Sequence, residues 1–307
     1  VGILLDQLEA DGVMENSVIF FWSDHGGNLL RQKRAVGDSG LHVPLIIRYP
    51  DGYRAGETES RMVSLMDLGP TVLSLTGQKP PKYMDGKAFA GPFEEAPRDY
   101  IFGSADRFDE STDMQRSVLD GRYVYIKNFM PELPLIYRNR YREQIPMNKH
   151  LIELDAEGKL EGDAAYIFMK TKPQEELYDL KNDPYEVHNL ANDPAHAEKL
   201  KLLRSQLSQW QSSIQDRGFT PESEIIREFW PGVLQPVTAD VKIQQQNNTI
   251  VLSCATQGAS IAYQLSDAIG TDYWQLYTKP LLLQPQEKIS TRAIRIGYKA
   301  SNIITTK

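Results

Sequence analysis

The distribution of apolar residues predicts alternating helices and strands over the first part of the chain. An apolar stripe at helical spacing near the start, followed by Gly12, predicts a helix. Unbroken apolar runs within residues 17–22 and 43–47 predict two strands buried on both faces of a parallel sheet. A second helical stripe, with Pro70 tolerated in its first turn, predicts another helix. The two stripes consist of Val1, Leu4, Leu5 and Leu8, and of Leu65, Leu68, Val72 and Leu75.

Short alternating stretches replace this pattern after Pro80 and Pro81. They predict a small antiparallel sheet, interrupted by an irregular excursion from about residue 130 to 173. A narrow apolar stripe then predicts a helix laid against that sheet. The stretches are residues 100–103, 116–119, 122–127 and 176–180, and the stripe is Leu200, Leu203, Leu207, Trp210 and Ile214.

The last part of the chain differs in composition from the rest. A Gln/Asn tract at residues 244–248 is followed by alternating runs such as 261–265 and 289–293, with no helical pattern. These features predict a separate small β-sandwich of about 70 residues from residue 236 onward.

Composition restricts the class of protein. The 307 residues carry a net charge of −7 and no dense Lys/Arg block, which argues against nucleic acid as a partner. No apolar run reaches the roughly 18 residues of a membrane helix, and the first residue, Val1, is followed by no targeting signal. The single cysteine, Cys254, excludes internal disulfides and Cys-based metal cages.

The loop that follows the first strand carries the candidate chemistry. Asp24 and His25 lie where a buried strand opens into Gly26 and Gly27, so that both side chains are able to turn toward one cation. The alternative is that this dipeptide only caps or forms a turn.

Lys33 lies in the same loop. Its compact ammonium suits the non-bridging oxygens of a sulfate or phosphate ester, although a basic loop segment is also typical of solvated surface. A metal ligand pair and a cation on one loop therefore point to an oxyanion substrate.

Several ordered motifs resemble the second half of a sulfatase catalytic domain of the alkaline-phosphatase superfamily. They are Ser-Asp-His-Gly at residues 23–26, Lys33, Val-Pro-Leu-Ile at 43–46, Ser-Leu-Met-Asp-Leu at 64–68, Pro-Thr at 70–71, and Glu-Leu-Tyr-Asp-Leu at 176–180 with Asp183, Pro184, Glu186, Asn189 and Leu190. The resemblance covers about residues 1–230. It implies an α/β alkaline-phosphatase-like sulfatase fold comprising the C-terminal part of the large sheet (1–95) and a subdomain of small antiparallel sheet plus helix (96–235), followed by the β-sandwich module (236–307).

The resemblance also implies roles for three residues. Asp24 and His25 would ligate a metal, calcium first, with zinc or manganese as alternatives because imidazole suits them better. Lys33 would be the catalytic residue that contacts the sulfate. Sulfatases use a formylglycine made from a Cys/Ser-x-Pro-x-Arg motif, which this sequence lacks, so the nucleophile is expected upstream, in an N-terminal part of the catalytic domain outside this chain.

Two more residues are candidates for substrate binding. Arg107, in an acidic and basic cluster after the third predicted strand, could hold a second anionic group bidentately, although such clusters usually form surface ion pairs. His42 lies at the end of the candidate loop and could contact substrate, with packing or hydrogen bonding as the other interpretation.

The terminal module resembles the fibronectin-like β domain at the C terminus of chitobiase-type glycosidases. The resemblance rests on residues 258–263, Trp274, Tyr277 with Pro280, Ala293, and Gly297 with Tyr298. Trp274 or Tyr277 could stack on sugar, but aromatic residues of small sandwiches are usually core residues.

Together these patterns predict part of a periplasmic or secreted sulfatase acting on a sulfated carbohydrate such as a glycosaminoglycan. One alternative is a phosphatase or phosphodiesterase of the same superfamily. Another is a non-catalytic carbohydrate-binding fragment.

Overall fold

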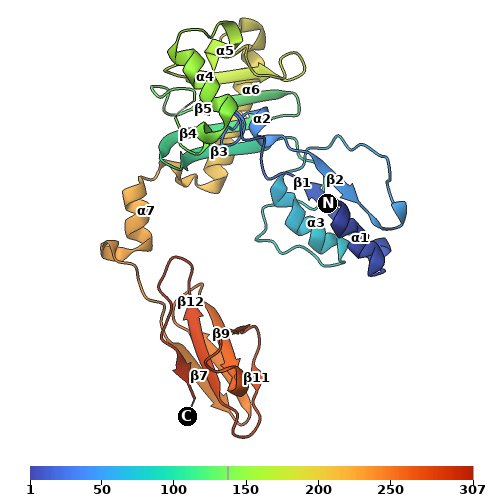
Figure 1. Ribbon diagram of the computed structural model, residues 1–307, viewed down its shortest axis with the longest axis vertical. Helices are drawn as coiled ribbons and strands as arrows, with labels where there is room; N and C mark the ends of the chain where they lie inside the picture. Colours follow the sequence, from blue (N-terminus) through green and yellow to red (C-terminus); the bar gives the residue numbers. More distant parts are fainter. Residues whose placement is uncertain (137, 307) are drawn as a thin grey trace. The chain divides into compact units, whose positions relative to one another are not determined.

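A computed structural model describes residues 1–136 and 138–306. The chain divides into two compact units, Val1–Asp216 and Arg217–Lys307, which are described in turn (Figure 1). The predicted domain boundaries at residues 95 and 235 stay predictions. Within the described residues no helix is long and apolar enough to cross a bilayer.

The first part of unit 1 has two main helices and a pair of strands. They are α1 (Gly2–Ala10), β1 (Ile19–Trp22), β2 (Leu45–Arg48) and α3 (Leu68–Leu75), and the one-turn helix α2 (Asp38–Leu41) lies between the strands. Both predicted helices are present. Pro70 lies in the first turn of α3, where its missing N–H breaks no helical bond.

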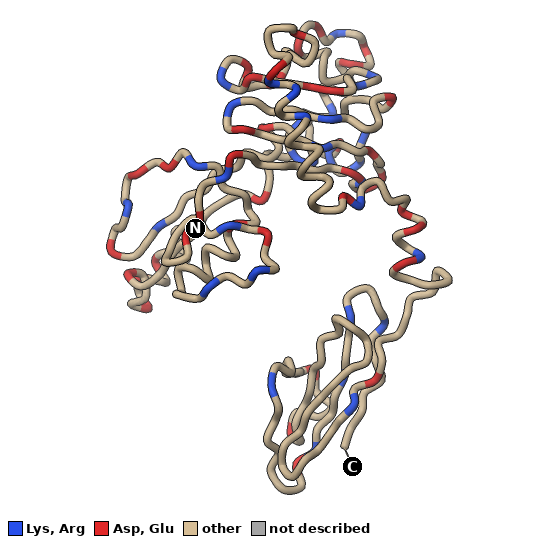
Figure 2. The backbone as a smooth tube through the Cα atoms, turned by 180° about the vertical axis from the view of Figure 1, so that it is seen from behind, with Lys and Arg blue, Asp and Glu red and all other residues tan. Residues whose placement is uncertain are grey.

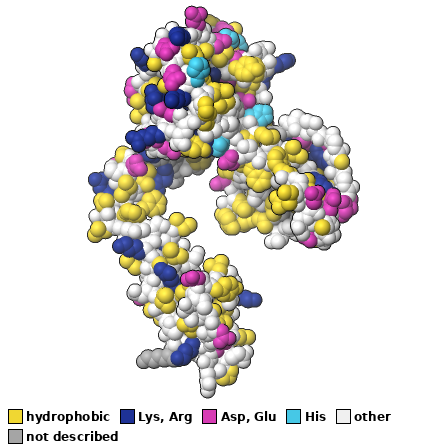
Figure 3. All heavy atoms as spheres, viewed as in Figure 1, with side chains coloured by type: hydrophobic (Ala, Val, Ile, Leu, Met, Phe, Trp, Pro, Cys, Tyr) yellow, Lys and Arg dark blue, Asp and Glu magenta, His cyan; other side chains and the backbone are white. Residues whose placement is uncertain are grey.

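The predicted parallel arrangement of the two strands is wrong. β1 and β2 pair antiparallel, with Phe20 opposite Ile47, and Phe21 and Trp22 are 47% and 44% exposed. The connection between the strands contains only the one-turn helix α2, and not the longer helix that usually forms the crossover of a parallel pair. Yellow side chains gather over α1, β1, β2 and α3 in Figure 3, so this part of unit 1 presents apolar surface.

A four-stranded antiparallel sheet forms the second part of unit 1, as predicted. Its order is β3 (Ile101–Phe108), β4 (Ser111–Leu119), β5 (Tyr123–Asn128), β6 (Glu175–Asp179). Helix α6 (Ala197–Ile214) packs Leu203 and its neighbours against Val118 and Leu177. Trp210 of this helix stacks on Phe102 with ring centroids 4.8 Å apart. The predicted apolar stripe is therefore the face of α6 that covers the sheet.

The excursion between β5 and β6 is more regular than predicted. It contains α4 (Pro146–Ala156) and α5 (Gly162–Tyr166). Short 3-10 turns of unit 1 are η1 (Met14–Asn16), η2 (Pro50–Gly52), η3 (Leu65–Asp67), η4 (Arg142–Gln144) and η5 (Pro194–His196).

The sheet has a second apolar cluster that includes a residue of the candidate loop. Val36, from the segment between β1 and β2, is buried with Ala105, Val124, Ile126 and Tyr178. The loop is thus anchored in the core of the small sheet.

Unit 2 begins with η6 (Arg217–Phe219), α7 (Glu222–Phe229) and η7 (Pro231–Val233) and continues with seven strands among its described residues. One sheet has the order β10-β9-β12-β13 and the other β11-β8-β7. A single apolar cluster takes buried residues from both sheets, among them Ile250 and Ile289. Tyr277 packs against this cluster, in agreement with its interpretation as a core residue. The strands are β7 (Val241–Gln246), β8 (Thr249–Cys254), β9 (Ser260–Leu265), β10 (Gln275–Leu276), β11 (Leu281–Leu282), β12 (Ile289–Ile294) and β13 (Ile304–Thr305), with η8 (Ser266–Ala268) after β9. The fibronectin-like assignment stays a prediction.

Candidate functional site

Asp24 and His25 face each other in the turn that follows β1. The Nε2 atom of His25 lies 3.5 Å from Oδ2 of Asp24, whose side chain is 82% exposed. The other ring nitrogen, Nδ1, is 2.6 Å from the carbonyl oxygen of Gly26, which can only accept a hydrogen bond. The carboxylate is also only an acceptor, but it is the more distant of the two, so in the neutral imidazole the closer Gly26 carbonyl favours the proton on Nδ1 and leaves the lone pair on Nε2.

This arrangement fits a metal ion. A carboxylate oxygen and an imidazole nitrogen at this separation are close enough to contact one cation, and a backbone carbonyl on the second nitrogen is the usual support of a ligating histidine. Among the described residues no three His, Cys, Asp or Glu side chains gather into a metal site. Asp24 and His25 alone would therefore supply no more than two side chains to such a site.

Backbone hydrogen bonds connect the rest of the candidate loop to the turn that carries Asp24 and His25. The N–H of Lys33 donates to the carbonyl of Gly27 at 3.0 Å, and the N–H of Gly26 donates to the carbonyl of Gly40 at 2.9 Å. A Cβ atom on Gly26 would overlap the backbone of Ser39, so only glycine fits there. These bonds bring the backbone of Lys33 beside the segment that carries Asp24 and His25.

The Lys33 ammonium lies against an aromatic ring. Its Nζ atom is 5.1 Å from the ring centroid of Tyr141, and Cζ of Arg34 is 5.5 Å from the same centroid. No carboxylate of the described residues forms an ion pair with Lys33, whereas Arg34 pairs with Asp109. The aromatic face holds the ammonium without neutralising its charge.

Residues 185 and 186, which are far from the loop in sequence, form hydrogen bonds that fix its shape. The guanidinium of Arg31 donates to the carbonyl oxygens of Tyr185 and Glu186 at 2.9 and 2.7 Å. The buried carboxylate of Glu186 accepts the N–H of Asp38 at 2.9 Å, where α2 begins. Gly37 is packed against the same carboxylate so closely that a Cβ atom would overlap it. We call Arg31, Gly37, Asp38 and the 185–186 turn the loop clasp.

Burial raises the pKa of the Glu186 carboxyl, against the opposing effects of the Asp38 N–H and Arg31. The ionised form is thus disfavoured by desolvation and favoured by its two partners. Arg31 and Arg34 both have positive φ angles, 64° and 74°. A loop with two such residues needs the tertiary contacts that the clasp supplies.

The other two candidate residues, His42 and Arg107, take no part in the backbone hydrogen bonds made by Gly26 and Lys33. His42 is 76% exposed and its Nδ1 is 3.3 Å from Oδ2 of Asp38, so it is a hydrogen-bonding rather than a packed residue. Arg107 is half-buried near the end of β3, opposite Thr112. The turn after this strand holds Asp109, which pairs with Arg34, so the β3–β4 hairpin contacts the candidate loop.

The cluster around Arg107 is not confined to surface ion pairs. Arg116 is 1% exposed and donates to both Asp106 and Asp216 at 2.7 to 3.1 Å. This buried guanidinium ties β4 to the end of α6. Elsewhere acidic and basic residues are interspersed along the backbone (Figure 2).

Neither Tyr141 nor Glu186 was predicted from the sequence to contact the candidate loop. Tyr141 lies within a polar excursion, and Glu186 is far from the loop in sequence. Glu186 belongs to the motif that resembles the family, which was the one available indication of importance.

Comparisons with known proteins find similarity to sulfatases. Residues 1–78 match the family model described as Sulfatase. An ulvan-active sulfatase of Formosa agariphila is 44% identical over 307 residues, which is 99% of this chain and 52% of that protein. The N-sulphoglucosamine sulphohydrolase of Homo sapiens is 26% identical over 252 residues, 77% of this chain and 50% of that protein.

A solved structure, that of a 2-O GAG sulfatase, superposes with a TM-score of 0.51 at 21% identity, over 70% of this chain and 40% of that one. The fold is thus of the alkaline-phosphatase-like class, as the sequence predicted. The chain is thus similar to sulfatases, over residues 1–78 by the family model and over nearly all of its length by the relative from Formosa agariphila. It spans about half the length of the two curated relatives described above.

Proposed function

We propose that the protein carrying this chain hydrolyses sulfate esters of a sulfated carbohydrate. The observation that supports this most strongly is the facing pair of Asp24 and His25, with the backbone of Lys33 hydrogen-bonded to the following Gly27. The relatives are named for action on ulvan and on N-sulphoglucosamine, and they favour this reading over the phosphatase alternative. A glycosaminoglycan or ulvan-like polymer is the substrate class we infer.

Asp24 and His25 would hold the metal ion, calcium first and zinc or manganese otherwise, through one oxygen and Nε2. When bound, such an ion polarises the ester as a Lewis acid. The Gly26 carbonyl keeps the imidazole in the tautomer that leaves Nε2 available. The remaining ligands and a formylglycine nucleophile would come from a part of the protein outside these residues.

Lys33 would offset the negative charge of the sulfate. Its ammonium is held by the Tyr141 ring and has no carboxylate partner among the described residues, so its charge is available to the ester oxygens. His42 and Arg107 would contribute contacts to the rest of the substrate. We place this activity in the periplasm or the medium, where a sulfated polysaccharide is encountered.

The test is the substitution Asp24→Ala in the whole protein, with aryl sulfate and a sulfated oligosaccharide as substrates. Loss of a ligand should lower turnover by about 100-fold or more, judged from the effects of even outer metal partners. Asp11→Ala, which removes an exposed carboxylate at the end of α1, is the matched control and should retain activity. Near wild-type turnover of the Asp24 variant, or a preference of the wild type for phosphate monoesters, would refute the proposal.

A further inference from the structure

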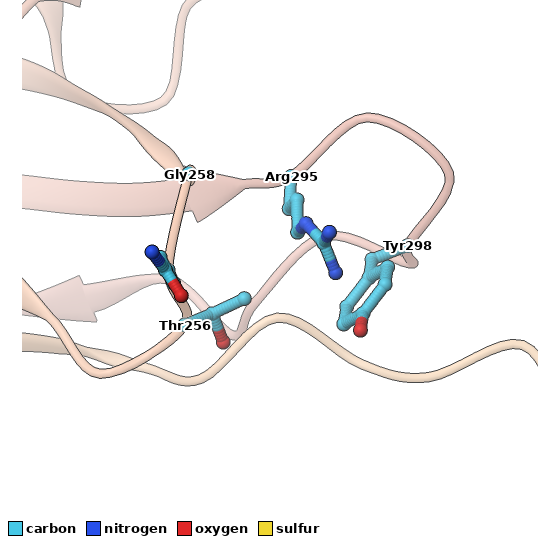
Figure 4. A pocket seen from close by; sticks show the side chains of 5 residues that line it. Thr256, Gly258, Arg295 and Tyr298 are labelled. Atoms are coloured by element: carbon cyan, nitrogen blue, oxygen red, sulfur yellow. The ribbon is translucent and has the colours of Figure 1, made fainter. Parts of the chain in front are cut away.

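A surface pocket in unit 2 brings two loops together. It has a volume of about 650 Å³ and is lined by Thr256, Gln257 and Gly258, which follow β8, and by Arg295 and Tyr298, which follow β12 (Figure 4). All of these residues belong to the same unit. The pocket is thus lined entirely by residues of unit 2.

The guanidinium of Arg295 is stacked on an aromatic ring. Its Cζ atom is 4.5 Å from the ring centroid of Tyr298, and both residues are half-buried. No carboxylate of the described residues forms an ion pair with Arg295. Arg217 of the same unit, by contrast, pairs with Glu228. Arg295 therefore presents its planar set of donors at a pocket without an internal anion to satisfy them.

The loop that carries this pair is held in one conformation. The N–H of Tyr298 donates to the carbonyl of Arg295 at 3.0 Å, and Gly297 has a φ of 85°, which is the geometry of a type II turn. The Gly297 carbonyl accepts the indole N–H of Trp230 at 2.9 Å. The N–H of Arg295 donates to the Thr238 hydroxyl at 3.1 Å. A guanidinium on such a loop loses little conformational freedom on binding a ligand.

The opposite loop is equally ordered and leaves room for a ligand. The Thr256 hydroxyl accepts the N–H of Ala239 at 2.9 Å, so its position is fixed. A Cβ atom on Gly258 would lie 3.9 Å from Nε of Arg295, and Gly258 itself has a φ of 76°. The glycine keeps this side of the guanidinium free of a side chain.

We propose that this pocket binds an anionic saccharide unit of a polysaccharide, through its sulfate or carboxylate group. The planar fork of Arg295 matches two oxygens of either group, and stacking on Tyr298 leaves its donors directed outward. The Tyr298 ring and the polar groups of Thr256 and Gln257 suit the apolar and hydroxyl faces of a sugar. Such a site would retain the polymer without turnover, which goes beyond the proposed hydrolysis.

The experiment measures binding of the whole protein to dextran sulfate, polygalacturonate and neutral dextran by calorimetry. All variants carry Lys33→Ala, so that contacts of Lys33 do not contribute and the outcome does not depend on hydrolysis. Arg295→Ala should weaken binding of at least one polyanion by about tenfold, the usual effect of losing hydrogen bonds to a charged group. Preference for dextran sulfate or for polygalacturonate distinguishes sulfate from carboxylate recognition.

Arg292→Ala is the matched control, because Arg292 is an exposed cation on β12. It should leave the affinity unchanged. Arg295→Lys keeps the charge and loses the planar fork, so it should bind more weakly than the parent, and its melting curve reports whether the module stays folded. Equal effects of the Arg295 and Arg292 alanine variants, equal binding of neutral dextran, or no binding of either polyanion would overturn the proposal.

Discussion

The loop clasp predicts that removing the Glu186 carboxylate destabilises the candidate loop. Glu186→Ala deletes the acceptor of the half-buried Asp38 N–H, which lies 2.9 Å from the carboxylate. Leaving the Asp38 N–H without its acceptor costs about 1–3 kcal/mol, whether the carboxyl that is removed is protonated or ionised. We expect a loss of about 2 kcal/mol of unfolding free energy near pH 5.

Glu186→Gln is the matched variant, since its amide oxygen can still accept the Asp38 N–H while carrying no charge. The folded-state pKa of Glu186 is raised above its ordinary 4.5. Protonation of Glu186 therefore contributes to the stability of the fold, fully at pH values below 4.5, and this contribution is lost as pH rises through the folded-state pKa. The stability of the wild type should therefore fall, relative to the glutamine variant, as pH rises above about 4.5.

Urea unfolding at pH 5 and pH 8 measures the free energies, and hydrogen exchange of the Asp38 amide reports the loop itself. Exchange of this amide should accelerate in the alanine variant and stay slow in the glutamine variant. If exchange within residues 37–42 is the same in the wild type and the alanine variant, the clasp does not hold the loop and the reasoning fails.

Two further predictions concern ring and ion-pair contacts. Tyr141→Phe keeps the ring beneath the Lys33 ammonium and should retain the Michaelis constant for aryl sulfate, whereas Tyr141→Leu should raise it by about two- to fivefold, in line with about 0.5–1 kcal/mol for an exposed contact of this kind. Equal kinetics of both variants would count against the positioning role. Hydrogen bonding to Arg122 lowers the pKa of Asp179 from its ordinary 3.8 to about 2, so this pair stabilises the fold above pH 4 and the benefit is lost as pH falls toward 2. In urea titrations Arg122→Ala should reduce stability at pH 6 and converge with the wild type near pH 2, and a constant difference at every pH would contradict the assignment.

The local periodicity of apolar residues was sufficient to predict most of the helices and strands. The stripe around Leu203 predicted α6, and alternation predicted the four antiparallel strands, because each pattern is set by the face that a residue turns to the core. The direction of β1 against β2 was mispredicted because an unbroken apolar run has the same appearance in either direction. Helix α4 was missed because its apolar positions are few and it begins at Pro146 after an irregular segment.

Only part of the candidate site could likewise be predicted from the sequence. Asp24 and His25 are adjacent in the chain, so a turn was enough to predict that they face one side, and their side chains lie 3.5 Å apart. The contacts that shape the rest of the loop come from residues more than 100 positions away, as with Glu186 and Tyr141. No local pattern encodes such pairings, since they depend on how the sheet is assembled. The ligand and substrate roles themselves stay predictions.

The anchoring of the loop at Val36 and Glu186 has a consequence for dissecting the protein. A shorter polypeptide that stops before residue 186 would still contain Asp24, His25 and Lys33 in its sequence. It would lack α6 and the buried Glu186 carboxylate that contacts the loop at Gly37 and Asp38. A proteolytic cut between residues 130 and 170 would instead leave Glu186 and the residues that bury Val36 in the protein, so these contacts with the loop would be retained.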